Sequence, residues 1–126
     1  MYPTNSAHNV KELSDKISSV RFAMFTTTDK HGHLVATPMT NQEMDKEGHL
    51  WFYTSITTGL WEDIAATPEV NVSFAEPKDG LYVSVSGRAE RVVERAKIHE
   101  LWNPFVEAWF PNGPDDPHVS LIRVVP

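Results

Sequence analysis

Hydrophobic and polar residues alternate along several short segments, a pattern typical of half-buried strands. Val70, Val72 and Phe74, for example, are separated by small or polar residues. The segment Arg21–Thr28 is rich in aromatic and β-branched residues, which also favour strand. The strands that we predict span residues 21–28, 33–40, 49–55, 70–75, 81–93 and 118–125.

A helical period appears near the start of the chain. Val10, Leu13, Ile17 and Val20 recur every three or four residues, which predicts a short amphipathic helix. Either Ser6 or Asn9 is expected to cap its first turn, because both are preferred N-cap residue types. That cap would satisfy amides that otherwise lack a partner.

Three further helices are predicted between or after strands. The first runs over residues 59–66, with Thr58 as its N-cap and Pro68 ending it. The second spans residues 94–102. Asn103-Pro104 then predicts a new helix start, with Asn as the cap and Pro in the first helical position.

Turns and breaks complete the pattern. Turns are expected at residues 29–32, 45–48 and 77–80, each ending in glycine. Pro38 cannot donate to a sheet ladder, so it predicts an edge, a bulge or a ligand-facing break. Gly87 predicts a bulge or bend in the long strand 81–93. Six strands with inserted helices indicate a mainly β fold: one domain, residues 1–126, forming an antiparallel barrel with peripheral helices.

Composition narrows the class of partner. The chain has 126 residues, a formal net charge of −6 and no cysteine. This charge argues against nucleic-acid binding, which needs a basic face. The lack of cysteine excludes disulfides and thiol catalysis. No apolar run reaches the roughly 20 residues that span a bilayer, so we expect a cytoplasmic protein without membrane contact.

The segment "YTSITTGLWEDI", residues 53–64, carries the first candidate chemistry. Thr54, Ser55, Thr57 and Thr58 place hydroxyls before a predicted helix start, and Gly59 leaves the backbone accessible. Helix N-termini bind phosphate, so an anion site is one interpretation. An ordinary capped helix is the other. No lysine or arginine occurs in the segment to neutralise an anion.

Four tryptophans stand out in so small a chain: Trp51, Trp61, Trp102 and Trp109. Aromatic and methionine side chains suit a flat, partly polar ligand such as a flavin. Core and interface packing is the alternative for each.

Charged residues offer weaker candidates. Arg21 and Arg88 lie in predicted strands and could each hold an anion, although pairing with a carboxylate is more usual. His31 and His33 flank a turn residue without an obvious third ligand, so we predict no metal site. The sequence contains no nucleophile elbow and no dinucleotide-binding glycine motif.

Five segments together resemble the general stress protein family. These are "RFAMFTTTDKHGHLVATPM", "LWFYTS", "VNVSFAEP", "YVSVSGRAE" and "ELWNPFVEAWFPNGPDDPHVSLIRVVP", in that order. The family belongs to the flavin-binding split barrels related to pyridoxamine 5′-phosphate oxidase. The resemblance covers residues 10–126 and implies a six-stranded antiparallel split barrel. It also implies a homodimer that binds FMN in two equivalent clefts at the subunit interface.

The resemblance assigns cofactor-binding positions residue by residue. Trp102 and Trp109 would close the cleft from the partner subunit, and Thr58 and Gly59 would form the turn of the phosphate loop. Leu60 follows that turn. The remaining cofactor-binding positions are Phe22, Ala23, Met24, Thr37, Pro38, Met39, Phe52, Tyr53 and Thr54.

Two substitutions distinguish this chain from its relatives. Relatives carry an arginine at the position of Thr37 and a lysine at that of Leu60, both near the cofactor's phosphate. Relatives also continue beyond Pro126 with a further tail. Amides, hydroxyls and either Arg21 or Arg88 would have to replace the missing cations.

The resemblance leaves three functions open. We expect an FMN-dependent oxidoreductase of unknown substrate, with pyridoxamine 5′-phosphate itself disfavoured. The first alternative is a degenerate dimer that binds another small ligand or has no catalytic activity. The second is a haem or deazaflavin protein, which for haem would require His49 or His118 to face the cleft.

Overall fold

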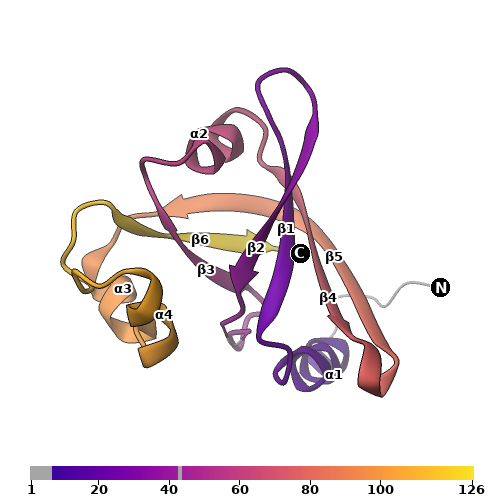
Figure 1. Cartoon of the computed structure of the whole chain (residues 1–126). Helices are drawn as coiled ribbons and strands as arrows, with labels where there is room; N and C mark the ends of the chain where they lie inside the picture. The colour runs from indigo at the N-terminus through magenta and orange to yellow at the C-terminus, as the bar shows by residue number, and fades with distance from the viewer. Residues whose placement is uncertain (1–6, 43) are drawn as a thin grey trace.

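The computed structural model describes residues 7–42 and 44–126, which fold into one strongly curled antiparallel sheet with helices around it (Figure 1). All six predicted strands are present, with ends that differ by at most one residue from those expected. In chain order the elements are α1 (Ala7–Ile17), β1 (Phe22–Thr28), β2 (Leu34–Thr40), β3 (Leu50–Ser55), α2 (Gly59–Ala66), β4 (Glu69–Glu76), η1 (Pro77–Asp79), β5 (Leu81–Val92), α3 (Arg95–Leu101), α4 (Pro104–Trp109) and β6 (Val119–Val125).

The sheet is a barrel that does not close. Its strand order is β2-β1-β4-β5-β6-β3, and every paired strand is antiparallel. Strands β2 and β3 therefore form the two edges, which curling brings into contact without a ladder between them. Pro38 lies in β2, where an edge strand tolerates its missing amide hydrogen.

The long strand β5 makes the curl possible by pairing with different neighbours along its length. It pairs with β4 as far as Arg88 and with β6 from Arg88 onward. The register with β4 is unbroken across Gly87, so the feature predicted there is a bend rather than a bulge. A Cβ at Gly87 would lie 2.5 Å from the Val125 carbonyl oxygen, so only glycine permits this close approach.

Two turns use the same local chemistry. Asp29 accepts hydrogen bonds from the amides of His31 and His33 at 2.9 Å each, and Asp45 repeats the pattern with the amides of Glu47 and His49. The aspartates hold each turn because their side chains substitute for backbone acceptors. The turns join β1 to β2 and lead into β3, so they set the positions of both sheet edges.

Helix α1 follows the predicted pattern, with one correction. Val10, Leu13 and Ile17 pack against the barrel core, whereas Val20 is buried just beyond the helix end. The helix begins at Ala7, so Asn9 lies within it and its prediction as the cap was wrong. Ser6, the other predicted cap, lies outside the described residues.

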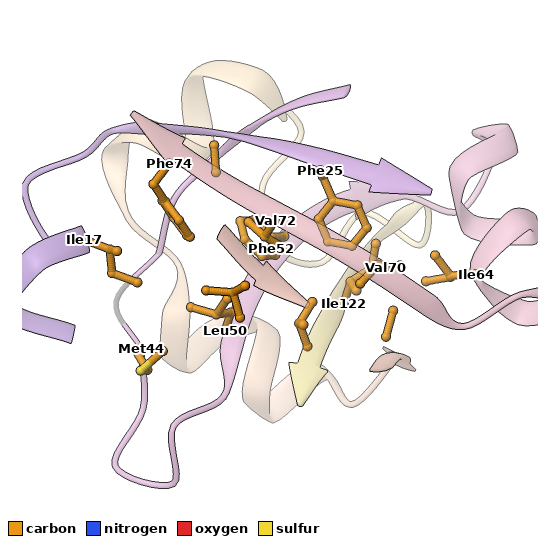
Figure 2. Close-up of a cluster of buried hydrophobic side chains, with 14 of the residues drawn as sticks. Ile17, Phe25, Met44, Leu50, Phe52, Ile64, Val70, Val72, Phe74 and Ile122 are labelled. Carbon is orange, nitrogen blue, oxygen red and sulfur yellow. The ribbon is translucent and has the colours of Figure 1, made fainter. Parts of the chain in front are cut away.

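The buried side chains form two clusters, one on each face of β3. Figure 2 shows the larger cluster inside the barrel, where Leu50 and Phe52 of β3 meet residues from the other strands. Phe25 packs edge-on against Phe52, with ring centroids 5.3 Å apart. The smaller cluster lies on the opposite face of β3, where Trp51 and Tyr53 are covered by α3 and α4.

Replacing Gly87 with alanine tests the bend. We expect Gly87→Ala to lower the free energy of unfolding by about 1–3 kcal/mol, because its Cβ would clash with backbone that cannot easily move. Gly59→Ala is the control: a Cβ there meets nothing within 4 Å, and alanine favours a helix. Urea unfolding measures both, and equal stability of the two variants would contradict the account of β5.

Candidate functional site

A pocket of about 490 Å³ lies at the opening between the two edge strands. Strand β2 forms one wall, β3 forms another, and α4 and the start of α2 contribute the rest. Its size falls within the range of small-molecule sites, and its lining is mainly apolar with a few polar groups. The barrel thus has a mainly apolar pocket where its sheet is split.

The pocket brings together most of the residues predicted to bind the cofactor. These are Phe22, Thr37, Pro38, Met39, Tyr53, Thr54, Thr58, Leu60 and Trp109. Trp109 lines the pocket of its own chain, whereas the resemblance implied a contribution from the partner subunit.

Five predicted residues do not line this pocket within one protomer. Ala23 and Phe52 point into the barrel core because they lie on the inner face of their strands. Met24 faces outward and is 40% exposed. Gly59 begins α2 beside the pocket residue Thr58, and Trp102 packs edge-on against Tyr53 at 5.5 Å. Gly59 and Trp102 therefore adjoin the pocket.

Five lining residues were not among the positions assigned to the cofactor: Thr40, Gln42, Ser55, Val106 and Phe110. Of these, the sequence had marked Ser55 as a hydroxyl of the candidate anion loop. Val106 and Phe110 belong to α4 and its C-cap, and only the tertiary packing of α4 on β3 brings them here. Gln42 follows β2 in a short polar stretch that has no periodicity. No sequence signal marks the other four residues, since their role depends on how distant elements meet.

Tyr53 supplies a fixed aromatic wall. Its hydroxyl donates to the Ile98 carbonyl oxygen at 2.6 Å, and Trp102 packs against its ring. Burial raises the pKa of Tyr53 above its ordinary value. The hydroxyl is therefore neutral and occupied by a structural bond, which disfavours a role in proton transfer.

The loop between β3 and α2 gathers hydroxyl groups at one end of the pocket. The side chains of Ser55 and Thr57 are hydrogen-bonded at 2.7 Å. Thr58 occupies the N-cap position of α2, as predicted, but its hydroxyl donates to the Ser55 carbonyl oxygen and makes no capping bond. The first turn of α2 is thus left without the usual cap acceptor, which favours an external anion there.

The positions of the two absent family cations converge on this pocket. Thr37 and Leu60 both line it, and its described lining includes no lysine or arginine. Neither proposed replacement reaches it within one protomer. The Arg21 guanidinium lies 4.4 Å from the Phe105 ring centroid, and Arg88 pairs with Glu69 at 3.4 Å on an exposed surface.

Among the polar residues that line the pocket, Gln42 has unusual hydrogen bonding. Its side chain is 7% exposed, and its Oε1 accepts a hydrogen bond from Asn103 Nδ2 at 2.7 Å. Among the described residues, no acceptor lies within hydrogen-bond distance of Gln42 Nε2. A buried donor without a partner is uncommon in folded proteins.

The histidines do not converge on a site. Neither His49 nor His118 lines the pocket, so the condition for a haem ligand is not met within the described chain. No group of three or more metal-binding side chains occurs among residues 7–42 and 44–126. Across those residues, every helix is too short or too polar to cross a membrane.

Comparison with known proteins identifies the family. A family described as "Pyridoxamine 5'-phosphate oxidase like" matches residues 8–126. The chain belongs to this pyridoxamine 5′-phosphate oxidase-like family, and the predicted six-stranded split barrel is confirmed.

Several relatives are similar over most of the chain. Protein bli-3 of Neurospora crassa is 34% identical, with 91% of this chain aligned. The chain spans 60% of the length of that relative. Two solved structures are also similar to this chain. A general stress family protein from Xanthomonas campestris is 35% identical, with a TM-score of 0.69. A "general stress FMN/FAD binding protein" from Xanthomonas citri is 29% identical, with a TM-score of 0.77. They align with 91% and 94% of this chain, and with 82% and 84% of their own chains.

Tyr53→Phe tests the wall of the pocket. We expect a loss of about 1–3 kcal/mol in unfolding free energy, because the buried Ile98 carbonyl would lose its hydroxyl donor. The control is Tyr82→Phe, since Tyr82 is 70% exposed and should contribute nothing.

The same variant also tests how the free energy of unfolding depends on pH. The raised pKa means that Tyr53 stabilises the fold fully below about pH 10 and loses that contribution as pH rises further. Urea unfolding at pH 8 and pH 11 should therefore show a smaller alkaline loss in Tyr53→Phe than in wild type. An identical alkaline loss in both proteins would contradict the role given to the hydroxyl.

Proposed function

We propose that the protein binds FMN in the pocket between β2 and β3. The observation that carries this proposal is the convergence of the residues that the resemblance assigns to the flavin on one pocket. Aromatic and thioether groups there, including Phe22, Met39 and Trp109, suit a planar ring system. The relative from Xanthomonas citri described as FMN/FAD binding supports the same ligand class.

The phosphate would lie against the start of α2. The first turn of this helix has no side-chain cap, and Ser55 and Thr58 lie beside it. Backbone amides at a helix N-terminus can hold a phosphate without a nearby lysine. Because Thr37 and Leu60 are neutral, we expect FMN binding to be weaker than a site with both cations would give.

A second copy of the chain would close the pocket. On the outer face of β1 and β2, Phe22, Met24, Ala36 and Pro38 form an apolar patch, because paired residues share a face. Phe22 and Pro38 also line the pocket, so this patch is continuous with it. We therefore propose a homodimer with the cofactor at its interface.

The proposed reaction class follows from the proposed cofactor, because the pocket offers few groups for other chemistry. No charged side chain lines it among the described residues, and the Tyr53 hydroxyl is already bonded. The bound flavin would supply the redox chemistry, while the protein would orient it and limit water access. We propose a flavin-dependent oxidoreductase whose substrate is unknown. Its cytoplasmic location stays a prediction from the sequence, which has no bilayer-spanning apolar run and no cysteine.

Flavin titration of wild type and Leu60→Lys tests the proposed site. Wild type should gain absorbance near 450 nm that co-migrates with the protein. Leu60→Lys should bind FMN about 10- to 100-fold more tightly, because it restores a charge-assisted contact, with little effect on riboflavin. Fluorescence quenching measures both affinities.

Wild type that takes up neither flavin would overturn the proposal. The uncharged lining favours one second candidate, a site for an unphosphorylated planar ligand. In that case riboflavin would bind at least as tightly as FMN, and Leu60→Lys would leave both affinities unchanged.

Met24→Glu tests the dimer. Met24 is 40% exposed on the patch but does not line the pocket, so a charge there should separate two copies and weaken flavin binding at least tenfold. Val93→Glu is the matched control, because Val93 is 60% exposed beyond the end of β5. Sedimentation velocity reports the mass. A wild-type monomer that binds flavin fully would exclude the interface site.

A further inference from the structure

A second cavity, an open groove of about 790 Å³, lies where the turn at residues 45–48 meets α3. The ends of β3, β5 and β6 complete its walls, and it shares no lining residue with the pocket between β2 and β3. The two cavities also differ in chemistry. The first has no charged side chain among its described lining residues, whereas the groove is lined by four basic and four acidic side chains. The charge that a ligand would meet in the groove therefore depends on how each of these side chains is engaged.

Trp51 brings two of the basic side chains together. This residue is 4% exposed, and its indole Nε1 donates to Asp45 Oδ2 at 2.9 Å. Lys97 Nζ lies 4.8 Å from the centroid of the indole ring, and the Arg123 guanidinium carbon lies 5.7 Å from it. Each cation gains a cation–π contact, so one buried ring holds both of them in the same groove.

Both of these cations keep hydrogen-bond donors that the fold does not use. Lys97 Nζ makes one ion pair, with Glu100 at 2.6 Å, and an ammonium group has three donors. Arg123 binds Glu90 through Nε and Nη2, which leaves Nη1 without an acceptor among the described residues. The side chains of Lys97 and Arg123 are 32% and 35% exposed, so their charges are less screened than those on an open surface.

The acidic side chains of the groove are placed where they oppose these cations weakly. Asp45 is engaged by the Trp51 indole and by two backbone amides of its own turn. The side chains of Glu47 and Glu100 are 77% and 61% exposed, and Glu94 is also exposed, so water screens their charges. The more buried part of the groove therefore favours a negative charge.

Two further cations line the same groove. Lys46 is exposed in the turn, and the Arg91 guanidinium carbon lies 5.2 Å from the centroid of the Trp61 ring. Neither forms an ion pair with another residue that the structure describes. Both are thus available to an incoming anion, with Glu94 the one lining carboxylate that has no partner in the described chain.

We propose that this groove is a second ligand site, which binds a small dianion through Lys97 and Arg123. The chemical class is a molecule with two negative charges, carried by one phosphate group or by two carboxylates. Hydrogen bonds between such groups and charged donors are among the strongest in proteins. The Trp51 ring holds both cations before the ligand binds, which lowers the entropy lost on binding. The site is separate from the proposed flavin site and does not depend on it.

Anion titration followed by NMR tests the site. The Trp51 indole N–H lies in the groove and gives a resonance of its own. At pH 8 and constant ionic strength, inorganic phosphate or succinate should shift this resonance to saturation, whereas chloride should not. Lys97→Gln should weaken the binding about tenfold, because one charge-assisted contact is lost. Lys30→Gln is the matched control, since Lys30 is exposed in the turn at residues 29–32 and the same charge is removed.

Glu100→Gln should have the opposite effect. It removes the carboxylate that pairs with Lys97, so the ammonium group becomes available and the affinity for the dianion should rise. Glu107→Gln is its control, because Glu107 is exposed on α4 and does not line the groove. Urea unfolding checks that each variant folds. If Lys97→Gln does not fold, the comparison of Glu100→Gln with Glu107→Gln decides.

The two probes also distinguish the kinds of dianion. Saturation by phosphate alone would assign both charges to one group, and saturation by succinate alone would assign them to two; either result supports the site. A shift that chloride reproduces, or one that Lys97→Gln leaves unchanged, would overturn the proposal. Saturating riboflavin should leave the response intact, because the two cavities share no lining residue. If riboflavin abolished it, the dianion would lie in the first pocket and the proposal would be wrong.

Discussion

The structure depends on the burial of β3 on both faces while one edge of that strand stays unpaired. Leu50 and Phe52 fill the barrel, and Trp51 and Tyr53 are covered by α3 and α4. A strand buried on two faces needs a second layer, which here comes from a segment far along the chain. That layer places α4 opposite β2, and the space between them is the pocket.

The polar groups of the pocket are held by bonds that serve the fold. The Tyr53 hydroxyl binds the backbone of α3, Asn103 caps α4, and Thr58 bonds back to Ser55. Each bond holds a side chain in place before any ligand binds, so less side-chain conformational entropy is lost on binding. The site is therefore preorganised for recognition of shape and of a few hydrogen-bonding atoms, and it is poorly equipped for proton transfer.

The sequence predicted the fold well because its signals are local. Alternation located the strands, and turn residues such as Asp29 and Asp45 marked their ends. The pocket was only partly predictable. The resemblance located the β2 and β3 walls, but residue patterns could not reveal that Phe52 points into the core or that Gln42 meets Asn103 across 61 positions. Contacts of this kind arise only when distant elements pack.

The exchange of partners along β5 has a mechanical consequence. Strands β2, β1 and β4 form one half of the sheet, β6 and β3 form the other, and β5 is the single strand that hydrogen-bonds to both. The curvature of β5 near Gly87 thus influences how far apart the edge strands β2 and β3 lie where the pocket opens between them. Small changes in this bend would change the size of ligand that the pocket accepts, without replacing any side chain that lines the pocket.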